Sequence, residues 1–319
     1  MITGSRAEYG LLKNLIILLK NDKKIKLKLV VTGSHLSKKF GLTTKEIKRD
    51  GIKVEKKIKI LNASDTQKSI SKYFADGVVK FTEYLSSEKP DSLIILGDRY
   101  EIFAAAISAS FLNIPIYHIN GGDSTEGAID EFMRHSITKM SWLHFVSNLE
   151  SKKRILRMGE NPSKVFLVGS LGVERMKKLK NLKKKILEKK LNIDLNKKTI
   201  LVTYHPETKL STSPKKDFSE ILYALSNFKD FNIIFTAPNA DSQNELIIKM
   251  IKKFIKKNNN SHYYKSLGFH KYASLLKHIH CVLGNSSSGI IETPTFKIPS
   301  IDIGDRQKGR IFASSTLNC

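Results

Sequence analysis

Residues 92–118, SLIILGDRYEIFAAAISASFLNIPIYH, decide the fold class of this 319-residue chain. The apolar run Ser92–Leu96 is typical of a buried strand, and it is followed by the turn residues Gly97-Asp98-Arg99. A helical pattern over Tyr100–Leu112 and a second apolar run, Ile114–His118, complete a strand–helix–strand unit. Such a unit joins two parallel strands through a helix, so it predicts an α/β fold.

The same alternation continues in both directions along the chain. It predicts further strands at Ile25–Thr32, Leu143–Val146, Val165–Val168, Thr199–Tyr204, Asn232–Thr236, Cys281–Leu283 and Ser300–Ile303. It predicts further helices at Glu8–Lys20, Asp65–Leu85, Ala128–Lys139, Glu150–Met158, Glu174–Leu191, Lys216–Asn227, Gln243–Lys257, Lys271–His278 and Gly289–Thr293. The series is too long for one open sheet and breaks near Gly169–Asn196. We therefore expect two Rossmann-like domains facing a cleft, residues 1–175 and residues 176–319.

The formal net charge of +25 suggests a nucleic-acid or membrane surface at first sight. However, only nine arginines stand against 46 lysines, and the lysines are scattered along the chain. Nucleic-acid readers favour arginine and interleaved aromatic residues, so we expect no nucleic-acid partner. A positive cleft still attracts an anionic substrate such as a nucleotide.

Several simple features limit the class of protein further. The chain has no run of eighteen or more apolar residues, which argues against a membrane span. Its first residues lack the charged and apolar regions of a signal peptide, so we expect a cytoplasmic protein. Cys281 and Cys319 form neither a disulfide framework nor a metal-ligand spacing, and we expect no metal and no cofactor.

Ligands of parallel α/β sheets gather at the carboxyl ends of the strands. Six polar or glycine-rich junctions occupy that position here, and six such junctions describe one active cleft better than six accidental turns. They are Thr32–His35, Gly97–Arg99, His118–Asp123, His205–Glu207, Pro238-Asn239 and Gly284–Gly289.

The densest junction is HINGGDSTEGAIDEFMRH, residues 118–135, with two histidines, four carboxylates, an arginine and a glycine pair. A linker does not need so many titratable groups and a core does not tolerate them, so the stretch indicates acid–base chemistry. Asp130 and Arg134 are i,i+4 neighbours, which also suits an exposed helix salt bridge. With Gly121-Gly122 upstream and Asp98 at a nearby strand end, we favour an active-site face.

Other junctions carry weaker signals. The sequence GNSSSG, residues 284–289, precedes a helix, and we favour phosphate binding there over an ordinary N-cap. Arg6 opens a helix, where it suits either an anion or solvent. His205 suits a cleft or a structural role, and Asp98 with Arg99 suits an ion pair or a base beside an anion clamp.

Taken together, the motifs resemble a known family, the hydrolysing UDP-N-acetylglucosamine 2-epimerases, over essentially the whole chain. The resemblance rests on TGSRAEYGLL, GDRYE, HINGGDSTEGAIDEFMRHSITK, HFVSN, VGSLG, HPET, APN, GNSSSGIIE and GDRQKGR, in this order. It implies the two-domain fold shared with GT-B glycosyltransferases. It also implies conversion of a UDP-linked 2-acetamido sugar and water to the free 2-epimer and UDP. The usual product is N-acetylmannosamine for sialic acid synthesis, and a close branch uses UDP-2,4-diacetamido-2,4,6-trideoxyglucose for legionaminic acid.

The resemblance also implies site residues. It assigns catalysis to Asp98, Asp130, Arg134 and His205, with Asp123 and Asn120 nearby. It assigns UDP contacts to Arg6, Arg99, His205, Asn239, Ser286, Ser287, Glu292 and Arg306. Many relatives carry a glutamate or histidine at Asn120 and a glutamate at Asp123. An amide cannot act as a base, so if a glutamate at this position shuttles a proton in relatives, Asp98, Asp123 or Asp130 must serve here instead. The resemblance leaves open which residue deprotonates C2.

Two other functions compete with this interpretation. A glycosyltransferase of the same fold would bind a UDP-sugar but needs fewer carboxylates, and a nucleic-acid-binding module is suggested by charge alone. The resemblance further implies a homodimer or homotetramer. Only Met1-Ile2 precede the opening motif, where a strand of about five residues is expected. The chain also stops soon after a predicted strand, so we expect a chain that is truncated at its C-terminus.

Overall fold

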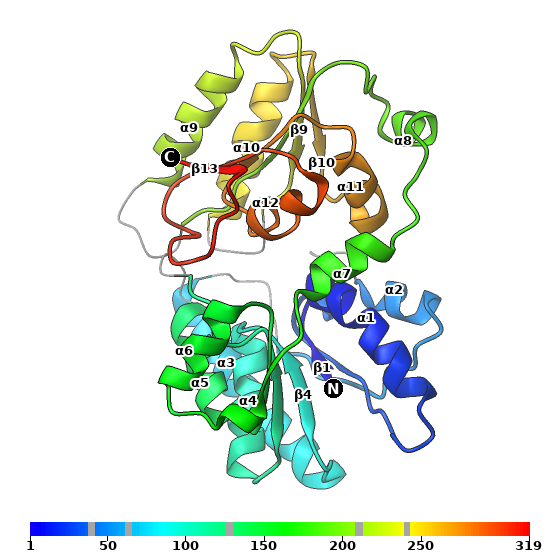
Figure 1. Ribbon diagram of the computed structural model, residues 1–319, viewed down its shortest axis with the longest axis vertical. Coiled ribbons are helices and arrows are strands. Elements are labelled where there is room, and N and C mark those ends of the chain that lie inside the picture. The colour runs from blue at the N-terminus through cyan, green and yellow to red at the C-terminus, as the bar shows by residue number, and fades with distance from the viewer. Residues whose placement is uncertain (38–41, 61–65, 126–129, 208–212, 239–242) are drawn as a thin grey trace. The chain divides into compact units, whose positions relative to one another are not determined.

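The computed structural model describes residues 1–37, 42–60, 66–125, 130–207, 213–238 and 243–319 (Figure 1). The chain divides into two compact units, and each unit is built on parallel strands with helices between them. Unit 1 comprises Met1–Asp123 and Asp130–Leu171, and unit 2 comprises Ser124–Ile129 and Gly172–Cys319. The predicted α/β fold class is confirmed.

The strands of unit 1 form two parallel sheets, in the orders β1-β2-β3 and β4-β5-β6-β7. Strand β1 also adjoins β4, so the chain order runs outwards from these two strands in opposite directions. A reversal of this kind is a topological switch point, at which α/β proteins bind their ligands. The strands are β1 (Ile2–Thr3), β2 (Val30–Val31), β3 (Lys56–Lys57), β4 (Leu93–Leu96), β5 (Ile116–Ile119), β6 (Leu143–Val146) and β7 (Val165–Leu167).

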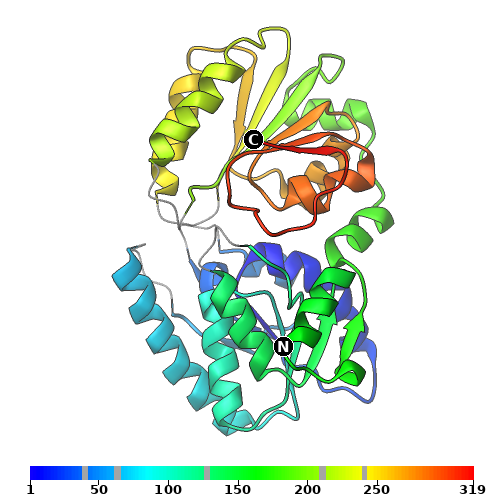
Figure 2. The ribbon, with the colours of Figure 1, turned by 60° about the vertical axis from the view of Figure 1, so that its left-hand side comes forward.

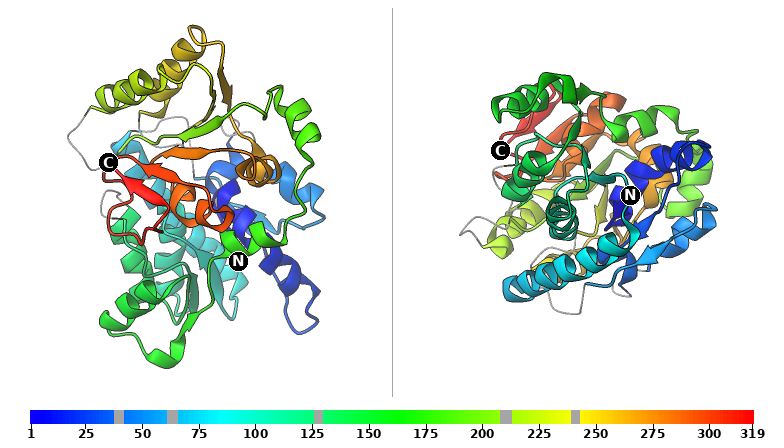
Figure 3. Two further views of the ribbon diagram at one scale, coloured as in Figure 1. Left: turned by 45° about the horizontal axis from the view of Figure 1, so that its top comes forward. Right: turned by 90° about the horizontal axis from the view of Figure 1, so that it is seen from below.

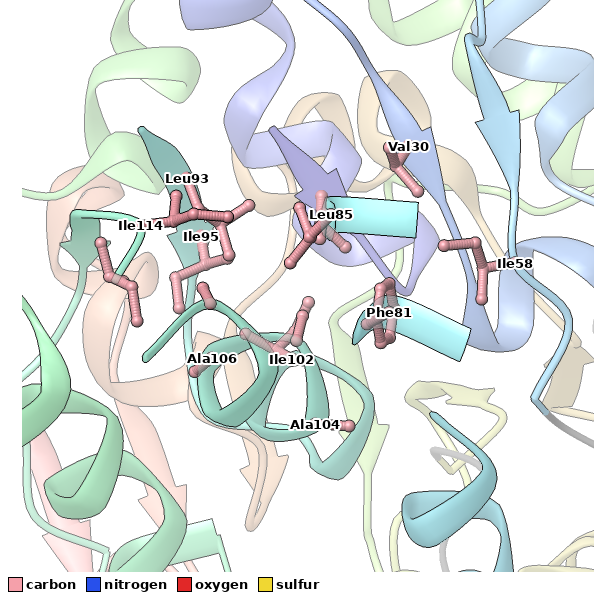
Figure 4. Close-up of a cluster of buried hydrophobic side chains, with 14 of the residues drawn as sticks. Val30, Ile58, Phe81, Leu85, Leu93, Ile95, Ile102, Ala104, Ala106 and Ile114 are labelled. Atoms are coloured by element: carbon pink, nitrogen blue, oxygen red, sulfur yellow. The ribbon is translucent and has the colours of Figure 1, made fainter. Parts of the chain in front are cut away.

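Helix α4 fills the centre of unit 1. Its sequence is apolar on every side, which suits a helix that is buried all round, and it packs against helices α3 and α5. Figure 4 shows Ile102 of α4 with Phe81 of α3 and Ile95 of β4, and all three are fully buried. The helices are α1 (Arg6–Asn21), α2 (Thr44–Arg49), α3 (Gln67–Glu88), α4 (Tyr100–Phe111), α5 (Asp130–Met140) and α6 (Leu149–Arg157).

Unit 2 has a single parallel sheet of six strands in the order β10-β9-β8-β11-β12-β13 (Figure 2). Its switch point lies between β8 and β11. Figure 3 shows β11 to β13, in orange to red, side by side. The strands are β8 (Thr199–Thr203), β9 (Asn232–Thr236), β10 (Ser261–Tyr264), β11 (Cys281–Gly284), β12 (Ser300–Asp302) and β13 (Thr316–Asn318).

Side-chain alternation along β8 gives unit 2 a core on each face of its sheet. Leu201 belongs to a cluster with residues of α8 and α11, whereas Ile200 and Val202 belong to a cluster with residues of α9 and α10. The helices are α7 (Leu171–Lys178), α8 (Lys184–Leu191), α9 (Pro214–Leu225), α10 (Asn244–Ile255), α11 (Gly268–Leu276) and α12 (Ser288–Ile291).

The prediction of one helix over Glu174–Leu191 is wrong. The structure has two helices, α7 and α8, because the backbone between them bonds to α11 instead of continuing the helix. The carbonyl of Lys180 lies 2.7 Å from Nε2 of His270, and the amide of Leu182 donates to Oγ of Ser274 over 2.9 Å.

The predicted strand Ile25–Thr32 is also too long. Strand β1 offers only two residues, so β2 pairs through Val30 and Val31 alone. The alternation did not reveal β1, β3, β10, β13 or α2, which are short or polar. The first two residues of the predicted helix Ala128–Lys139 lie outside the described residues.

The described residues contain neither a membrane-spanning helix nor a cluster of metal ligands. None of the helices in the described ranges combines the length and the apolar character that crossing a bilayer requires. In the same ranges, no three His, Cys, Asp or Glu side chains gather in a way that could hold a metal ion.

Candidate functional site

Arg134 of helix α5 is the centre of a polar cluster at the carboxyl end of β4. Its side chain is only 4% exposed, and Nη2 forms an ion pair with Oδ2 of Asp98, the second residue after the strand. Its Nη1 donates to the carbonyl of Asp123 over 2.9 Å and to Oε2 of Glu131 over 3.3 Å. The guanidinium therefore joins β4, the loop after β5 and the first turn of α5.

Asp98 is the carboxylate of this cluster that best suits proton transfer. Its side chain is 18% exposed, and among the described residues only Oδ2 has a partner, Arg134. The ion pair fixes the orientation of the carboxylate, and Oδ1 has no hydrogen bond within the described part of the chain. A general base needs both properties, a fixed position and an oxygen that can accept a proton.

Asp123 lies close to this cluster, but its side chain forms hydrogen bonds with helix α6 instead of with Arg134. Oδ1 of Asp123 accepts hydrogen bonds from Nδ2 of Asn148, over 3.2 Å, and from Oγ of Ser151. Asn148 is the N-cap of α6, so Asp123 stabilises the start of that helix.

Asn120 has a backbone φ of +61°, a left-handed conformation that asparagine adopts more easily than most residues. Its Oδ1 is buried and has no hydrogen-bond partner within the described residues. Such an atom is costly to leave unpaired, so it is a candidate contact for a bound ligand.

Sequence reasoning did not select Glu131. Its carboxylate accepts from Arg134 and lies 3.2 Å from Nε2 of His135, so it links these two side chains of the helix. The i,i+3 and i,i+4 spacings of these residues are the signal that could have identified it. Asp130, the first residue of α5, is partly buried.

His118 has a structural role in the core of unit 1. Its ring is fully buried, and Nε2 donates to the carbonyl of Gly97 over 2.8 Å. Burial lowers the pKa of His118 to about 4, so the ring stays neutral.

The two arginines that were predicted for UDP in unit 1 both have carboxylate partners. Nε of Arg6 lies 3.1 Å from Oε1 of Glu46 on α2, in an ion pair that is about one-third exposed. Nε of Arg99 donates to Oε1 of Glu101 over 3.0 Å, and Glu101 is fully buried. Sequence reasoning also missed Glu101.

His205 follows β8 at the switch point of unit 2, and a buried asparagine holds it. Oδ1 of Asn285 accepts from the His205 amide over 2.7 Å, and Nδ2 of Asn285 donates to the His205 carbonyl over 2.8 Å. Nη1 of Arg306 in turn donates to the Asn285 carbonyl over 3.2 Å. Burial, together with nearby Arg306, holds the pKa of His205 well below its usual range.

The serine-rich junction leads into a much shorter helix than an anion site built on a helix dipole needs. The helix predicted at Gly289–Thr293 is observed as α12, Ser288–Ile291, with four residues. Any anion contact at Ser286 and Ser287 therefore depends on their own hydroxyl and amide groups. Glu292 accepts from Oγ of Ser288, and burial raises its pKa. Asn239 lies outside the described residues.

Comparison with known proteins gives matches over most of the chain. Residues 18–319 match the family model described as UDP-N-acetylglucosamine 2-epimerase. The chain is 44% identical over 319 residues to the GDP/UDP-N,N'-diacetylbacillosamine 2-epimerase (hydrolyzing) of Campylobacter jejuni, covering 100% of this chain and 83% of that protein. It is 40% identical over 318 residues to the polysialic acid biosynthesis protein P7 of Escherichia coli, covering 99% of this chain and 81% of that protein.

The fold is also similar to solved structures. A crystal structure of the UDP-GlcNAc 2-epimerase of Methanocaldococcus jannaschii in complex with UDP-GlcNAc and UDP matches with a TM-score of 0.82. The match covers 100% of this chain and 87% of that chain at 21% identity. At this identity the likeness concerns the fold, and it agrees with the two-unit α/β architecture.

Proposed function

The chain belongs to the UDP-N-acetylglucosamine 2-epimerase family, and from this premise we propose that it is a hydrolysing 2-epimerase of UDP-linked 2-acetamido sugars. The observation that carries the proposal is the cluster at the end of β4, where buried Arg134 fixes the Asp98 carboxylate. This cluster offers an oriented base beside a switch point, which is what abstraction of a weakly acidic C–H proton needs.

The proposed reaction has two steps, elimination of UDP and addition of water. Asp98 takes the proton from C2 of the sugar while the bond between C1 and the UDP oxygen breaks, which leaves a 2-acetamidoglucal and UDP. Water then bonds to C1, and a proton is delivered to C2 from the opposite face, which gives the free 2-epimer. Asp130, Asp123 and Asn120 stand near the base in this scheme. We assign Arg134 a positioning role, because the contacts that the structure describes for it are with protein groups.

We propose that the departing diphosphate and the uridine are held by cationic and hydroxyl groups, which stabilise the charge that develops on UDP. Residues 1–175 would carry the sugar and the catalytic groups, and residues 176–319 would carry most of the UDP contacts. The proposed contacts are Arg6, Arg99, His205, Asn239, Ser286, Ser287, Glu292 and Arg306.

For the sugar, we favour the diacetamido substrate over UDP-N-acetylglucosamine. The support is the 44% identity, over the whole chain, to a relative named for diacetylbacillosamine. UDP-N-acetylglucosamine remains the second candidate, because the family description names it and because a 40% identical relative is named for polysialic acid biosynthesis. We further propose a cytoplasmic homodimer or homotetramer.

The deciding experiment incubates the purified protein with each sugar nucleotide in D2O. UDP- and GDP-diacetylbacillosamine and UDP-N-acetylglucosamine are compared, with UDP-glucose, which lacks the acetamido group, as the control. We expect release of UDP and a free 2-epimer that carries deuterium at C2, detected by NMR. A sugar that stays linked to its nucleotide would indicate a non-hydrolysing epimerase. Transfer to an acceptor without deuterium at C2 would indicate a glycosyltransferase.

A further inference from the structure

Two buried carboxylates at the switch point of unit 1 have no part in the reaction proposed above. Glu8 lies in the first turn of α1, directly after β1, and Glu101 lies in the first turn of α4, shortly after β4. Strands β1 and β4 are the pair at which the chain order reverses, so the two side chains stand where a ligand is expected.

Glu8 has a local structural role. Its Oε2 accepts from the Gly4 amide over 2.7 Å, and its Oε1 accepts from Oγ of Ser5 over 3.1 Å. Ser5 is the N-cap of α1 and accepts from the Glu8 amide in return, so the two residues form a capping box. These contacts account for Glu8 without any ligand.

Glu101 has no such local role. Its carboxylate is fully buried, Oε1 accepts from Nε of Arg99, and Oε2 has no hydrogen-bond partner within the described residues. It caps no helix, and its only cationic partner in those residues is two positions away in the chain. A buried carboxylate with one unpaired oxygen is costly, so stability alone does not explain it.

The backbone around Glu101 is shaped to hold the carboxylate in one place. A Cβ atom on Gly4 would lie 2.6 Å from Cγ of Glu101, and a Cβ atom on Gly33 would lie 2.7 Å from its Oε1. Glycine at both positions, shortly after β1 and β2, leaves room for the Glu101 side chain against the backbone.

We propose that Glu101 is a positioning residue, which orients the Arg99 guanidinium for contact with the diphosphate of the sugar nucleotide. The inference rests on the proposed function, in which Arg99 meets UDP. Nε is one of the five N–H donors of an arginine, and a hydrogen bond at Nε fixes the plane of the guanidinium. Planar recognition of phosphate oxygens depends on this orientation, and a simple positive charge does not provide it.

The charges around Glu8 and Glu101 also favour a cation at the position of Arg99. Burial and the nearby Glu101 charge raise the pKa of Glu8 to about 7, while Arg99 lowers it. The charge of Glu101 thus disfavours a second negative charge on Glu8, and the charge of Arg99 counteracts this effect.

The test compares UDP binding by calorimetry and steady-state kinetics in five proteins: wild type, Glu101→Gln, Arg99→Gln, the double variant, and Glu160→Gln as a matched control. Glu160 also pairs with a cation in unit 1, Lys139, at a distance from these residues along the chain. We expect Glu101→Gln to weaken UDP binding and raise KM about five- to tenfold, with kcat within about twofold. In the Arg99→Gln background, Glu101→Gln should have no further effect on UDP binding. The control should bind UDP like the wild type.

Two results would overturn the inference: UDP binding by Glu101→Gln equal to that of the wild type, or effects of the two substitutions that add independently. Wild type that binds no UDP would instead overturn the proposed function itself. Should Glu101→Gln fail to fold, Arg99→Lys replaces it, because lysine keeps the charge but loses the oriented fork. We expect that variant to lose a similar factor in UDP affinity, and wild-type affinity would contradict the inference.

Discussion

Asp98 and Arg134 form an ion pair that joins the end of strand β4 to helix α5 across 36 positions of the chain. The same guanidinium donates to the Asp123 carbonyl, so the pair also fixes the loop after β5. Position and reactivity of Asp98 thus depend on one buried cation, and the two residues can be tested separately.

We expect Asp98→Asn to lower kcat about 100- to 10,000-fold, because an amide keeps the shape of the side chain but cannot accept the C2 proton. UDP affinity should stay within about twofold of the wild type, since the assigned UDP contacts lie elsewhere. C2 deuterium exchange and calorimetry measure the two effects. A variant that retains exchange would transfer the role of base to Asp130 or Asp123.

We expect Arg134→Met to lower the free energy of unfolding by about 2–4 kcal/mol, because it leaves the partly buried Asp98 carboxylate without its partner. Urea titration of the variant measures this loss. The control is Lys139→Met, which removes a cation that is 52% exposed and paired with Glu160. That surface pair should be worth at most about 1 kcal/mol. Equal losses in the two variants would show that Arg134 is not a structural centre.

Local patterns were sufficient to predict most of the longer strands and helices of the fold. The strands at Leu143–Val146 and Asn232–Thr236 are observed with the bounds that the alternation predicts. The alternation of local patterns could not predict contacts between residues that are distant in the chain. The break between α7 and α8 depends on hydrogen bonds to His270 and Ser274, which are about 90 positions away.

The same limit applies to the site. Strand-end chemistry identified Asp98 and Arg134 as candidates, but the partner of each depends on how helices α4 and α5 pack beside the sheet. Glu101 looked like an ordinary residue of the first turn of a helix, where carboxylates are common. Only its burial against Gly4 and Gly33 reveals that the fold makes room for it.

A steric prediction concerns Gly122, which has a φ of +78°. A Cβ atom there would lie 2.5 Å from the Ser151 carbonyl oxygen, whereas a Cβ atom on Gly159, at φ +87°, meets nothing within 4 Å. Gly159→Ala should therefore cost only about 1–2 kcal/mol of backbone strain. Gly122→Ala should cost about 1–3 kcal/mol more, because the backbone must also move. Thermal and urea unfolding of both variants provide the comparison, and similar losses would contradict the close approach at Gly122.

The pKa of Glu8 predicts a pH dependence of stability. Burial and the Glu101 charge raise this pKa from 4.5 to about 7, so the folded chain holds a proton that the unfolded chain has already released. The contribution to stability is therefore complete below pH 4.5 and is lost as the pH rises through about 7. Glu8→Gln, which can still form the capping box, should match the wild type near pH 5 and exceed it by about 1–3 kcal/mol at pH 8.5. Urea unfolding at both pH values measures the difference, and a constant offset would argue against titration of Glu8.

A final prediction concerns Asn285, which joins the two strands at the switch point of unit 2. Its buried amide pairs with both the amide and the carbonyl of His205, and its own carbonyl accepts from Gln307 over 2.8 Å. Asn285→Ala removes the hydrogen bonds that Asn285 makes to two buried backbone groups, which should cost about 2–4 kcal/mol in the free energy of unfolding. Exposed Asn196 bonds to Asp194 in its own turn and accepts from Nζ of Lys184 at the surface, so Asn196→Ala should cost less than about 1 kcal/mol.

The same substitution also tests His205. Because Asn285 holds the His205 backbone at the end of β8, its loss should lower UDP affinity even under conditions where the variant remains folded. Calorimetry with UDP at low temperature, after circular dichroism has confirmed the fold, separates affinity from stability. His205→Asn should lose affinity by a similar factor, and the double variant should lose little more, because both substitutions remove the same contact. Full UDP affinity in folded Asn285→Ala would show that the loop after β8 does not meet the nucleotide.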